Sequence, residues 1–263
     1  MRILEKAQLV KTASNNYINR VKFKIQKEAA FLFEKKEAVL PADQKIVSFT
    51  FDDFPNTSKF NGARILESYK TRGTFYTSLG LAGTKTDVGL ISEQKIINSL
   101  SQNGHEIGCH TYGHLNCADT PTRILYENCI LNQNIAKKEM DISFLSFAYP
   151  FGKFNLSSKR IIQNNYLTAR TIKPGVNIKN IDLAALKSVP LYESSGKKNI
   201  LKWLDIMDKY GGWLIFYTHD VRENPSQYGC TINLFEEILK ECLLRNFKIM
   251  TVGAVAKNLL KQN

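Results

Sequence analysis

The sequence lacks the features that mark secreted and membrane-spanning proteins. Its five cysteines are an odd number without a CxxC pair, so we expect no disulfide framework. No apolar run approaches the ~20 residues that a membrane span needs. The longest apolar run before Ala38 covers residues 29–33, which is too short for the hydrophobic part of a signal peptide. These absences predict a cytoplasmic protein.

Acidic residues are scarce mainly in the N-terminal part of the chain. Of a net charge of +12, residues 1–36 carry +6, from nine Lys or Arg and three Glu. The remainder is only mildly basic, which argues against a nucleic-acid-binding protein. Apolar residues near helical spacing predict that residues 1–40 form a basic helical extension. Either this helix packs on the domain, or residues 1–38 contact an anionic membrane surface at the inner face of the membrane.

Strand-like and helix-like stretches alternate from Lys45 onward. Ser92, Thr120-Pro121 and Thr231 are typical of helix starts. Alternation of this kind predicts a parallel sheet with helices around it, and so an α/β fold. The alternation fits both an open sheet and a closed barrel. The number of strand candidates favours a distorted, TIM-like (β/α) barrel of seven or eight strands, a single catalytic domain over residues 41–263. The candidates are residues 46–51, 74–79, 106–109, 144–149, 167–171, 186–191, 213–218 and 247–252.

Four of these predicted strands run directly into residues suited to chemistry. In α/β barrels the working residues lie on the loops that follow the strands. Three of the four histidines and an adjacent carboxylate pair should therefore meet at one cavity mouth. The four segments are Asp52-Asp53, His110 to His114, Pro150 to Gly152, and His219-Asp220.

Two of these segments suggest a metal site. His110 and His114 are four residues apart, a spacing at which two imidazoles can bind one ion. One carboxylate of Asp52-Asp53 would complete a His₂Asp set and leave positions open for water and substrate, as in catalytic sites. Alone, either feature is weak, because HxxxH pairs are often unligated and Asp pairs often form turns. Nearby, we interpret Cys109, Cys117 and His105 as structural residues.

The motifs, taken in order, resemble those of the polysaccharide deacetylase family, also called the NodB-homology or carbohydrate esterase 4 family. This family includes chitin, peptidoglycan and nodulation-factor deacetylases. The resemblance covers residues from about 45 to 255 and leaves the N-terminal segment outside it. It is carried by residues 49–53 (FTFDD), 104–114 (GHEIGCHTYGH), 148–152 (AYPFG) and 216–220 (FYTHD).

The resemblance implies a role for each site residue. Asp53, His110 and His114 would hold one divalent metal ion, zinc by preference, with cobalt, nickel, iron or manganese as alternatives. Asp52 would be the general base that activates water, and His219 the general acid that protonates the leaving amine. A backbone N–H to stabilise the oxyanion would come from the loop that contains Tyr149, Pro150 and Phe151.

The sequence departs from the family pattern in two places. Ala148 stands where many members carry an arginine that orients the base. Arg170, at the end of the next predicted strand, either reaches the same base or forms a structural ion pair. The carboxylate that often tunes the acidic histidine is not recognisable, and Asp182 is the candidate for it.

The resemblance also predicts a reaction and alternatives to it. We expect a metal-dependent hydrolase that removes an N-acyl group, acetyl by preference, from an amino sugar in surface polysaccharide synthesis. Its substrate would be a sugar nucleotide, a lipid-linked sugar or an oligosaccharide. A deformylase or cyclic-amide hydrolase would use the same site, and a non-catalytic carbohydrate-binding or scaffold protein would keep only the fold.

Overall fold

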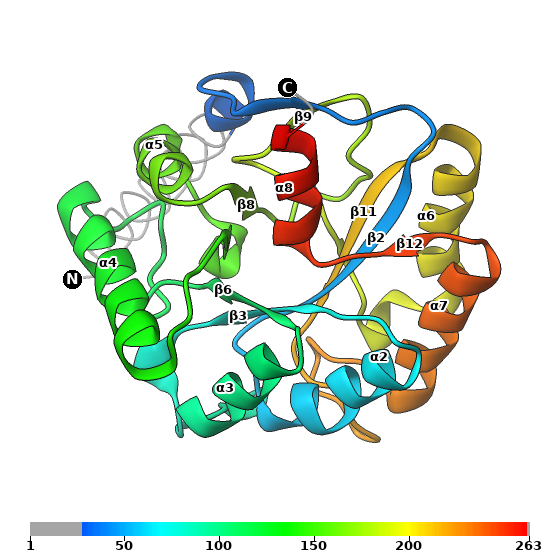
Figure 1. Ribbon diagram of the computed structural model, residues 1–263, viewed down its shortest axis with the longest axis horizontal. Helices are drawn as coiled ribbons and strands as arrows, with labels where there is room; N and C mark the ends of the chain where they lie inside the picture. Colours follow the sequence, from blue (N-terminus) through cyan, green and yellow to red (C-terminus); the bar gives the residue numbers. More distant parts are fainter. Residues whose placement is uncertain (1–27, 262–263) are drawn as a thin grey trace, which may run out of the picture.

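A curled parallel sheet forms the centre of the fold in a computed structural model that describes residues 28–261 (Figure 1). Its strands pair in the order β10-β11-β2-β3-β6-β7-β8, and β12 pairs with β2 beside this path. Each predicted strand overlaps one of them, which confirms the α/β class. The strands are β2 (Lys45–Phe51), β3 (Thr74–Thr77), β6 (Glu106–Cys109), β7 (Ser146–Ala148), β8 (Thr168–Arg170), β10 (Val189–Pro190), β11 (Gly212–Thr218) and β12 (Lys248–Ile249).

The two ends of this strand path, β8 and β10, are connected by an irregular stretch. Leu186, just before β10, donates its N–H to the carbonyl of Ala169 and accepts the N–H of Thr171, both at 2.9 Å. Leu183 accepts the N–H of Ala169 at 2.7 Å. The sheet therefore curls into a barrel that is distorted at this junction, because hydrogen bonds from a loop replace a regular ladder.

Apolar side chains on both faces of the central strands explain why these segments lie inside. All seven residues of β11 are buried, which is the usual pattern for a parallel strand covered on both sides. Phe51, the last residue of β2, stacks on Phe75 of β3 with ring centroids 4.4 Å apart and also contacts Phe235 of α7 (Ile232–Leu244). At Gly62, a Cβ would lie 2.6 Å from the ring of Phe51, so the chain approaches the sheet there only because the residue is glycine.

Helices surround the sheet (Figure 1). Thr231 caps α7 by accepting the N–H of Leu234 at 3.2 Å, as predicted. The other two predicted caps are wrong: Ser92 bonds to Asn56, and Thr120 bonds back to Asn116. In residues 28–261, no helix has both the length and the apolar character needed to cross a membrane. The helices are α2 (Arg64–Ser68), α3 (Gln94–Gln102), α4 (Thr122–Met140), α5 (Leu156–Asn165), α6 (Lys197–Tyr210), α7 (Ile232–Leu244) and α8 (Val252–Lys261), with shorter helical turns at Ser58–Ala63, Leu79–Leu81, Pro150–Gly152 and Glu193–Ser195.

The last helix, α8, lies across one end of the barrel (Figure 1). The carboxylate of Glu106, at the start of β6, accepts the N–H of Gly253 at 2.7 Å, and Thr74 accepts the N–H of Val252 at 3.0 Å. These first-turn N–H groups have no partner inside the helix, so the two side chains fix α8 to the starts of β3 and β6. His105 lies at this same end and bonds to Gly73, in agreement with a structural role.

The described part of the N-terminal segment packs on the barrel. Residues 28–32 are helical, but β1 (Glu37–Val39) pairs antiparallel with β9 (Asn180–Asp182), so the helix prediction is wrong for residues 37–39. Residues 1–27 lie outside the described residues, and the predictions of a basic helix and of a membrane contact there stay predictions. The boundary between the extension and the barrel domain also stays a prediction.

A buried lysine on α5 holds the described part of the N-terminal segment against the barrel. Lys159 of α5 donates to the carbonyls of Ala30 and Phe33, at 2.7 and 2.9 Å, and pairs with Asp182 at 2.6 Å. Its side chain is completely buried. A buried cation of this kind stabilises only while its partners are present, because its desolvation is otherwise uncompensated.

We predict that Lys159→Met lowers the free energy of unfolding by about 3–5 kcal/mol, because it leaves the Asp182 carboxylate unpaired. Urea unfolding measures the loss, with Lys202→Met, an exposed lysine on α6, as the control. Equal stability of the two variants would contradict a fastening role for Lys159.

Candidate active site

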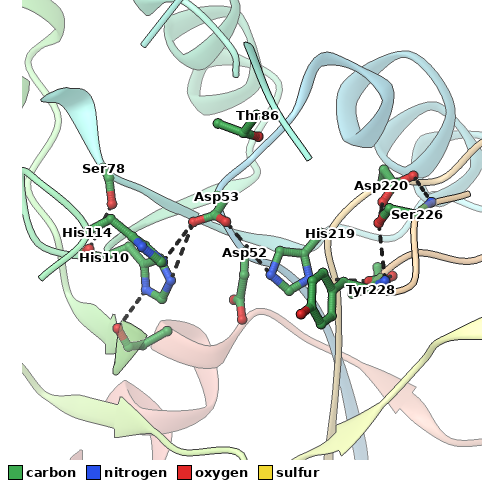
Figure 2. Close-up of polar contacts among 12 residues, drawn as sticks. Asp52, Asp53, Ser78, Thr86, His110, His114, His219, Asp220, Ser226 and Tyr228 are labelled. Atoms are coloured by element: carbon green, nitrogen blue, oxygen red, sulfur yellow. Dashed lines mark hydrogen bonds and ion pairs between the residues drawn. The ribbon is translucent and has the colours of Figure 1, made fainter. Parts of the chain in front are cut away.

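The polar residues predicted at the strand ends meet in one cavity of about 490 Å³. Asp52 and Asp53 follow β2, His110 and His114 follow β6, and His219 follows β11; all five line the cavity. In Figure 2, Asp53 lies between His110 and His114 on one side and His219 on the other. The volume is within the range of about 300–1,000 Å³ that is usual for small-molecule sites.

Asp53, His110 and His114 form the centre of the site. Nε2 of His114 lies 3.1 Å from Oδ1 of Asp53, and Nε2 of His110 lies 3.8 Å from the same atom. One potential ligand atom from each residue lies within 4.8 Å of those from the other two. Oδ1 of Asp53 is buried and receives no well-oriented hydrogen bond from the described residues. Two imidazoles and an otherwise unsatisfied carboxylate oxygen suit a divalent cation, zinc included.

His110 is held in the form that a ligand requires. Its Nδ1 donates to the carbonyl of Ala148 at 2.7 Å, which leaves Nε2 unprotonated and facing Asp53. Burial lowers the pKa of His110 to about 4, against the opposing effect of Asp52. The imidazole is therefore neutral at physiological pH. Ala148 lacks the arginine side chain that the resemblance leads one to expect there, but its carbonyl orients this histidine.

Left-handed backbone conformations concentrate at the site. Among non-glycine residues, φ is 56° at Asp53, 60° at Phe54, 61° at Thr111, 53° at His114 and 59° at Phe151. Such conformations cost on the order of 1–3 kcal/mol each and persist where the surrounding structure imposes them. The turn at Asp53 also solves a problem of geometry, because adjacent residues of a regular strand point to opposite faces. Here both neighbouring carboxylates line one cavity.

Arg170 crosses the barrel to Asp52. Its Nη2 contacts both carboxylate oxygens, and the guanidinium is completely buried between the rings of Tyr76 and Tyr217. Burial alone would raise the pKa of Asp52, but Arg170, His110 and His219 together outweigh it and hold the pKa below its ordinary value. Asp52 is consequently ionised at neutral pH. Of the two alternatives for Arg170, the contact with the candidate base is the one observed.

His219 faces Asp53 from the other side. Its Nε2 lies 3.9 Å from Oδ2 of Asp53, and its Nδ1 contacts the carbonyl of Tyr228 at 3.2 Å. The prediction that Asp182 tunes His219 is wrong, because the Asp182 carboxylate bonds to Lys159 and to the N–H of Ala184. No motif pointed to Tyr228, since it contributes a backbone carbonyl and any residue type has one.

The loop after β7 leaves one free backbone donor. Tyr149 donates its N–H to the carbonyl of Arg170 at 3.1 Å and its hydroxyl to Ala184 at 3.1 Å. Pro150 has no N–H. The N–H of Phe151 has no acceptor among the described residues, and its ring packs edge-on against His114 at 4.5 Å. Of the three predicted residues, Phe151 is thus the one whose N–H is available to a developing oxyanion.

Tyr192 and Tyr228, which the motifs did not indicate, form one wall of the cavity together with Tyr217 of the last motif. Tyr192 contacts both Tyr217 and Tyr228, with ring centroids 5.4 and 6.1 Å apart. Part of the rest of the wall comes from residues 86–88 of a small hairpin formed by β4 (Lys85–Thr86) and β5 (Gly89–Leu90). Sequence reasoning missed these residues because their chain positions are unremarkable and only the fold brings them to the cavity.

A family model described as polysaccharide deacetylase matches residues 40–169, which confirms the resemblance. None of the curated proteins matches the sequence of this chain.

Solved structures share the fold at low sequence identity. The Xyl-CE4 domain of a multidomain xylanase from the hindgut metagenome of Trinervitermes trinervoides has a TM-score of 0.60 and 16% identity, over 82% of this chain and 91% of that one. A Mycobacterium smegmatis protein described as a polysaccharide deacetylase has a TM-score of 0.62 and 14% identity, over 87% and 95%. A CE4 family pseudoenzyme from Bacillus anthracis has a TM-score of 0.55 and 12% identity, over 82% and 66%. Likenesses at these identities show the fold alone.

We predict that His114→Ala abolishes tight binding of one divalent ion, because it removes one of three ligands. The loss of affinity should exceed the about 10–100-fold that changes around a ligand cause. Zinc titration followed by calorimetry measures it. His219→Gln is the matched control and should keep the ion, so weakened binding in both variants would contradict the assigned ligand set.

Proposed function

Because this chain belongs to the polysaccharide deacetylase family through the domain that holds residues 40–169, we propose that it hydrolyses the N-acetyl group of an amino sugar with one divalent metal ion bound. The observation that carries the proposal is the arrangement around Asp53. Two histidines that can share an ion with it lie on one side, and a third histidine lies on the other. Asp52, the candidate base, lines the same cavity.

The side chains divide the reaction between them. A divalent ion held by Asp53, His110 and His114 would act as a Lewis acid that polarises the acyl carbonyl and acidifies water. Asp52, kept ionised by Arg170, accepts a proton from the attacking water as its oxygen bonds to the acyl carbon. Phe151 donates its N–H to the developing oxyanion. His219 delivers a proton from Nε2 to the amide nitrogen, so that the C–N bond breaks to release a neutral amine.

The cavity walls favour a sugar ring as the substrate. Tyr192, Tyr217 and Tyr228 offer flat apolar surface with polar tips, which suits the faces and hydroxyls of a pyranose. We propose an acetamido sugar in surface polysaccharide synthesis, carried on a nucleotide, a lipid or a short oligosaccharide. We also propose that the reaction occurs in the cytoplasm, at the inner membrane face. The five free, buried cysteines are consistent with a reducing compartment.

The alternatives predict different products from the same site. A deformylase would release formate, and a cyclic-amide hydrolase would open a ring without releasing an acid. A non-catalytic protein would release nothing, and one relative in fold is a pseudoenzyme. The contact between Arg170 and Asp52 favours catalysis, because it gives the candidate base a cationic partner in place of the family arginine.

We predict that Asp52→Asn lowers acetate release by about 10²–10⁴-fold, the usual contribution of a general base. Acetate is measured enzymatically with N-acetylated amino sugars, and formate is measured alongside it. Zinc content should stay unchanged, because Asp52 is not among the proposed ligands. Asp205→Asn, a surface carboxylate on α6, is the control. Undiminished release from Asp52→Asn would reject the proposed base.

The ionisation of Asp52, and with it the pH profile of the reaction, should depend on Arg170. In Arg170→Met the opposing effect of the guanidinium is gone, so burial dominates and the pKa of Asp52 rises. A higher pKa leaves less carboxylate ionised at a given pH, so the acid limb of the profile of kcat/KM should move to higher pH. Thermal unfolding verifies that the variant is folded. An acid limb that stays in place would mean that Arg170 does not control the ionisation of the base.

A further inference from the structure

We propose that Asp220 is a positioning residue that sets the orientation and tautomer of His219 through the loop between β11 and α7. This inference rests on the proposed function, in which His219 is the general acid. Asp220 itself does not line the cavity, so it would act only through other groups. The path runs from its carboxylate through Ser226 to the backbone of Tyr228, and from there to the imidazole.

The first step of the path is the pair of hydrogen bonds between Tyr228 and His219. The carbonyl of Tyr228 accepts the backbone N–H of His219 at 3.0 Å and its Nδ1–H at 3.2 Å. Because a carbonyl can only accept, Nδ1 must carry a proton. Nε2 is then the nitrogen that faces Asp53, at 3.9 Å from Oδ2.

The second step is the order that Asp220 imposes on the loop. Its carboxylate accepts the N–H and the hydroxyl of Ser226, at 2.8 and 2.5 Å, and pairs with Nε of Arg222 at 2.7 Å. The hydroxyl oxygen of Ser226 then accepts the N–H of Tyr228 at 3.2 Å. Figure 2 shows this sequence of contacts beside His219. The carbonyl that holds the imidazole is therefore placed by a completely buried carboxylate.

Close packing leaves this arrangement little freedom. A Cβ at Gly229 would collide with the carboxylate and the carbonyl of Asp220. Cys230 donates its N–H to that carbonyl at 3.0 Å, which closes the loop on Asp220 from the other side. The loop is thus shaped around Asp220, and a displaced carboxylate would displace Tyr228.

The orientation of the His219 ring determines which of its nitrogens can donate a proton to the amide. With Nδ1–H bonded to Tyr228, Nε2 holds the proton that passes to the amide nitrogen as the C–N bond breaks, and Nδ1–H stays bonded throughout. A ring free to rotate or to change tautomer would present the wrong nitrogen for part of the time. The rate of amide hydrolysis would fall although substrate binding would not.

The first test needs no substrate. With ¹⁵N-histidine in the full-length chain and zinc present, two-dimensional NMR above the pH range of imidazole titration reports the tautomer of each of four histidines. His219→Gln identifies the signal of His219. We expect the Nδ1–H form of His219 in the wild type, and a loss of this form in Asp220→Asn and Ser226→Ala. Ser226→Thr, which keeps the hydroxyl, should retain it. An unchanged His219 signal in Asp220→Asn and Ser226→Ala overturns the inference.

The second test separates positioning from stability. Asp220→Asn should lower kcat for the amide by about 10–100-fold, as is usual for residues that orient a functional group. KM should stay within about twofold. Hydrolysis of 4-nitrophenyl acetate, whose leaving group needs no proton, should be far less affected. Equal losses on amide and ester would also overturn the inference.

Asp182→Asn is the matched control, because Asp182 is a loop-ordering carboxylate that accepts backbone N–H groups away from the site. It should reduce thermal stability without changing the His219 signal or the ratio of amide to ester hydrolysis. A change in either would assign the effect of Asp220 to stability and overturn its positioning role. Absence of acetate release by the wild type would reject the proposed function, while the NMR result would still decide the structural role of Asp220.

Discussion

The left-handed turn at Asp53 and Phe54 is the constraint on which the site depends. In an extended strand, one of two adjacent carboxylates would point away from the cavity. The turn lets Asp52, directly after β2, face Arg170, while Asp53 turns to the three histidines. Phe54 is buried in the core, where its ring packs against Phe75, and this packing anchors the turn. The proposed metal ligand and the proposed base can therefore be neighbours in sequence and still have different roles.

The second consequence is electrostatic. Burial alone would raise the pKa of Asp52, which would favour the protonated, uncharged carboxyl. Arg170 prevents this at Asp52 from a position completely buried in the barrel, with tyrosine rings on either side. The negative charge of Asp52, the proposed base, is thus balanced from inside the protein. The open side of the cavity remains available to the substrate, and Asp53 keeps an unsatisfied oxygen for a cation.

Much of this organisation could be predicted from the sequence. Each strand candidate overlaps a strand, and the residues that follow four of them do meet, because strand alternation and strand-end placement are general features of α/β barrels. Element ends were less predictable: Ser92 and Thr120 have the chemistry of caps but bond elsewhere. Asp182 failed as the partner of His219 because only the fold shows that Lys159 takes its carboxylate. The backbone carbonyls that orient the histidines could not be predicted from the sequence, because any residue type has one.

That last point explains how the histidines of the site are oriented although the chain departs from the family motifs. His110 and His219 are both oriented by backbone carbonyls, those of Ala148 and Tyr228. A carbonyl fixes a tautomer as surely as a carboxylate does, provided that the loop carrying it cannot move. The orientation of the histidine then depends on the groups that hold the loop, and not on the type of residue that contacts the histidine. For His110 this is strand β7, which the barrel already fixes; for His219 it is a loop outside the sheet, which needs a buried carboxylate such as Asp220 to give it comparable rigidity.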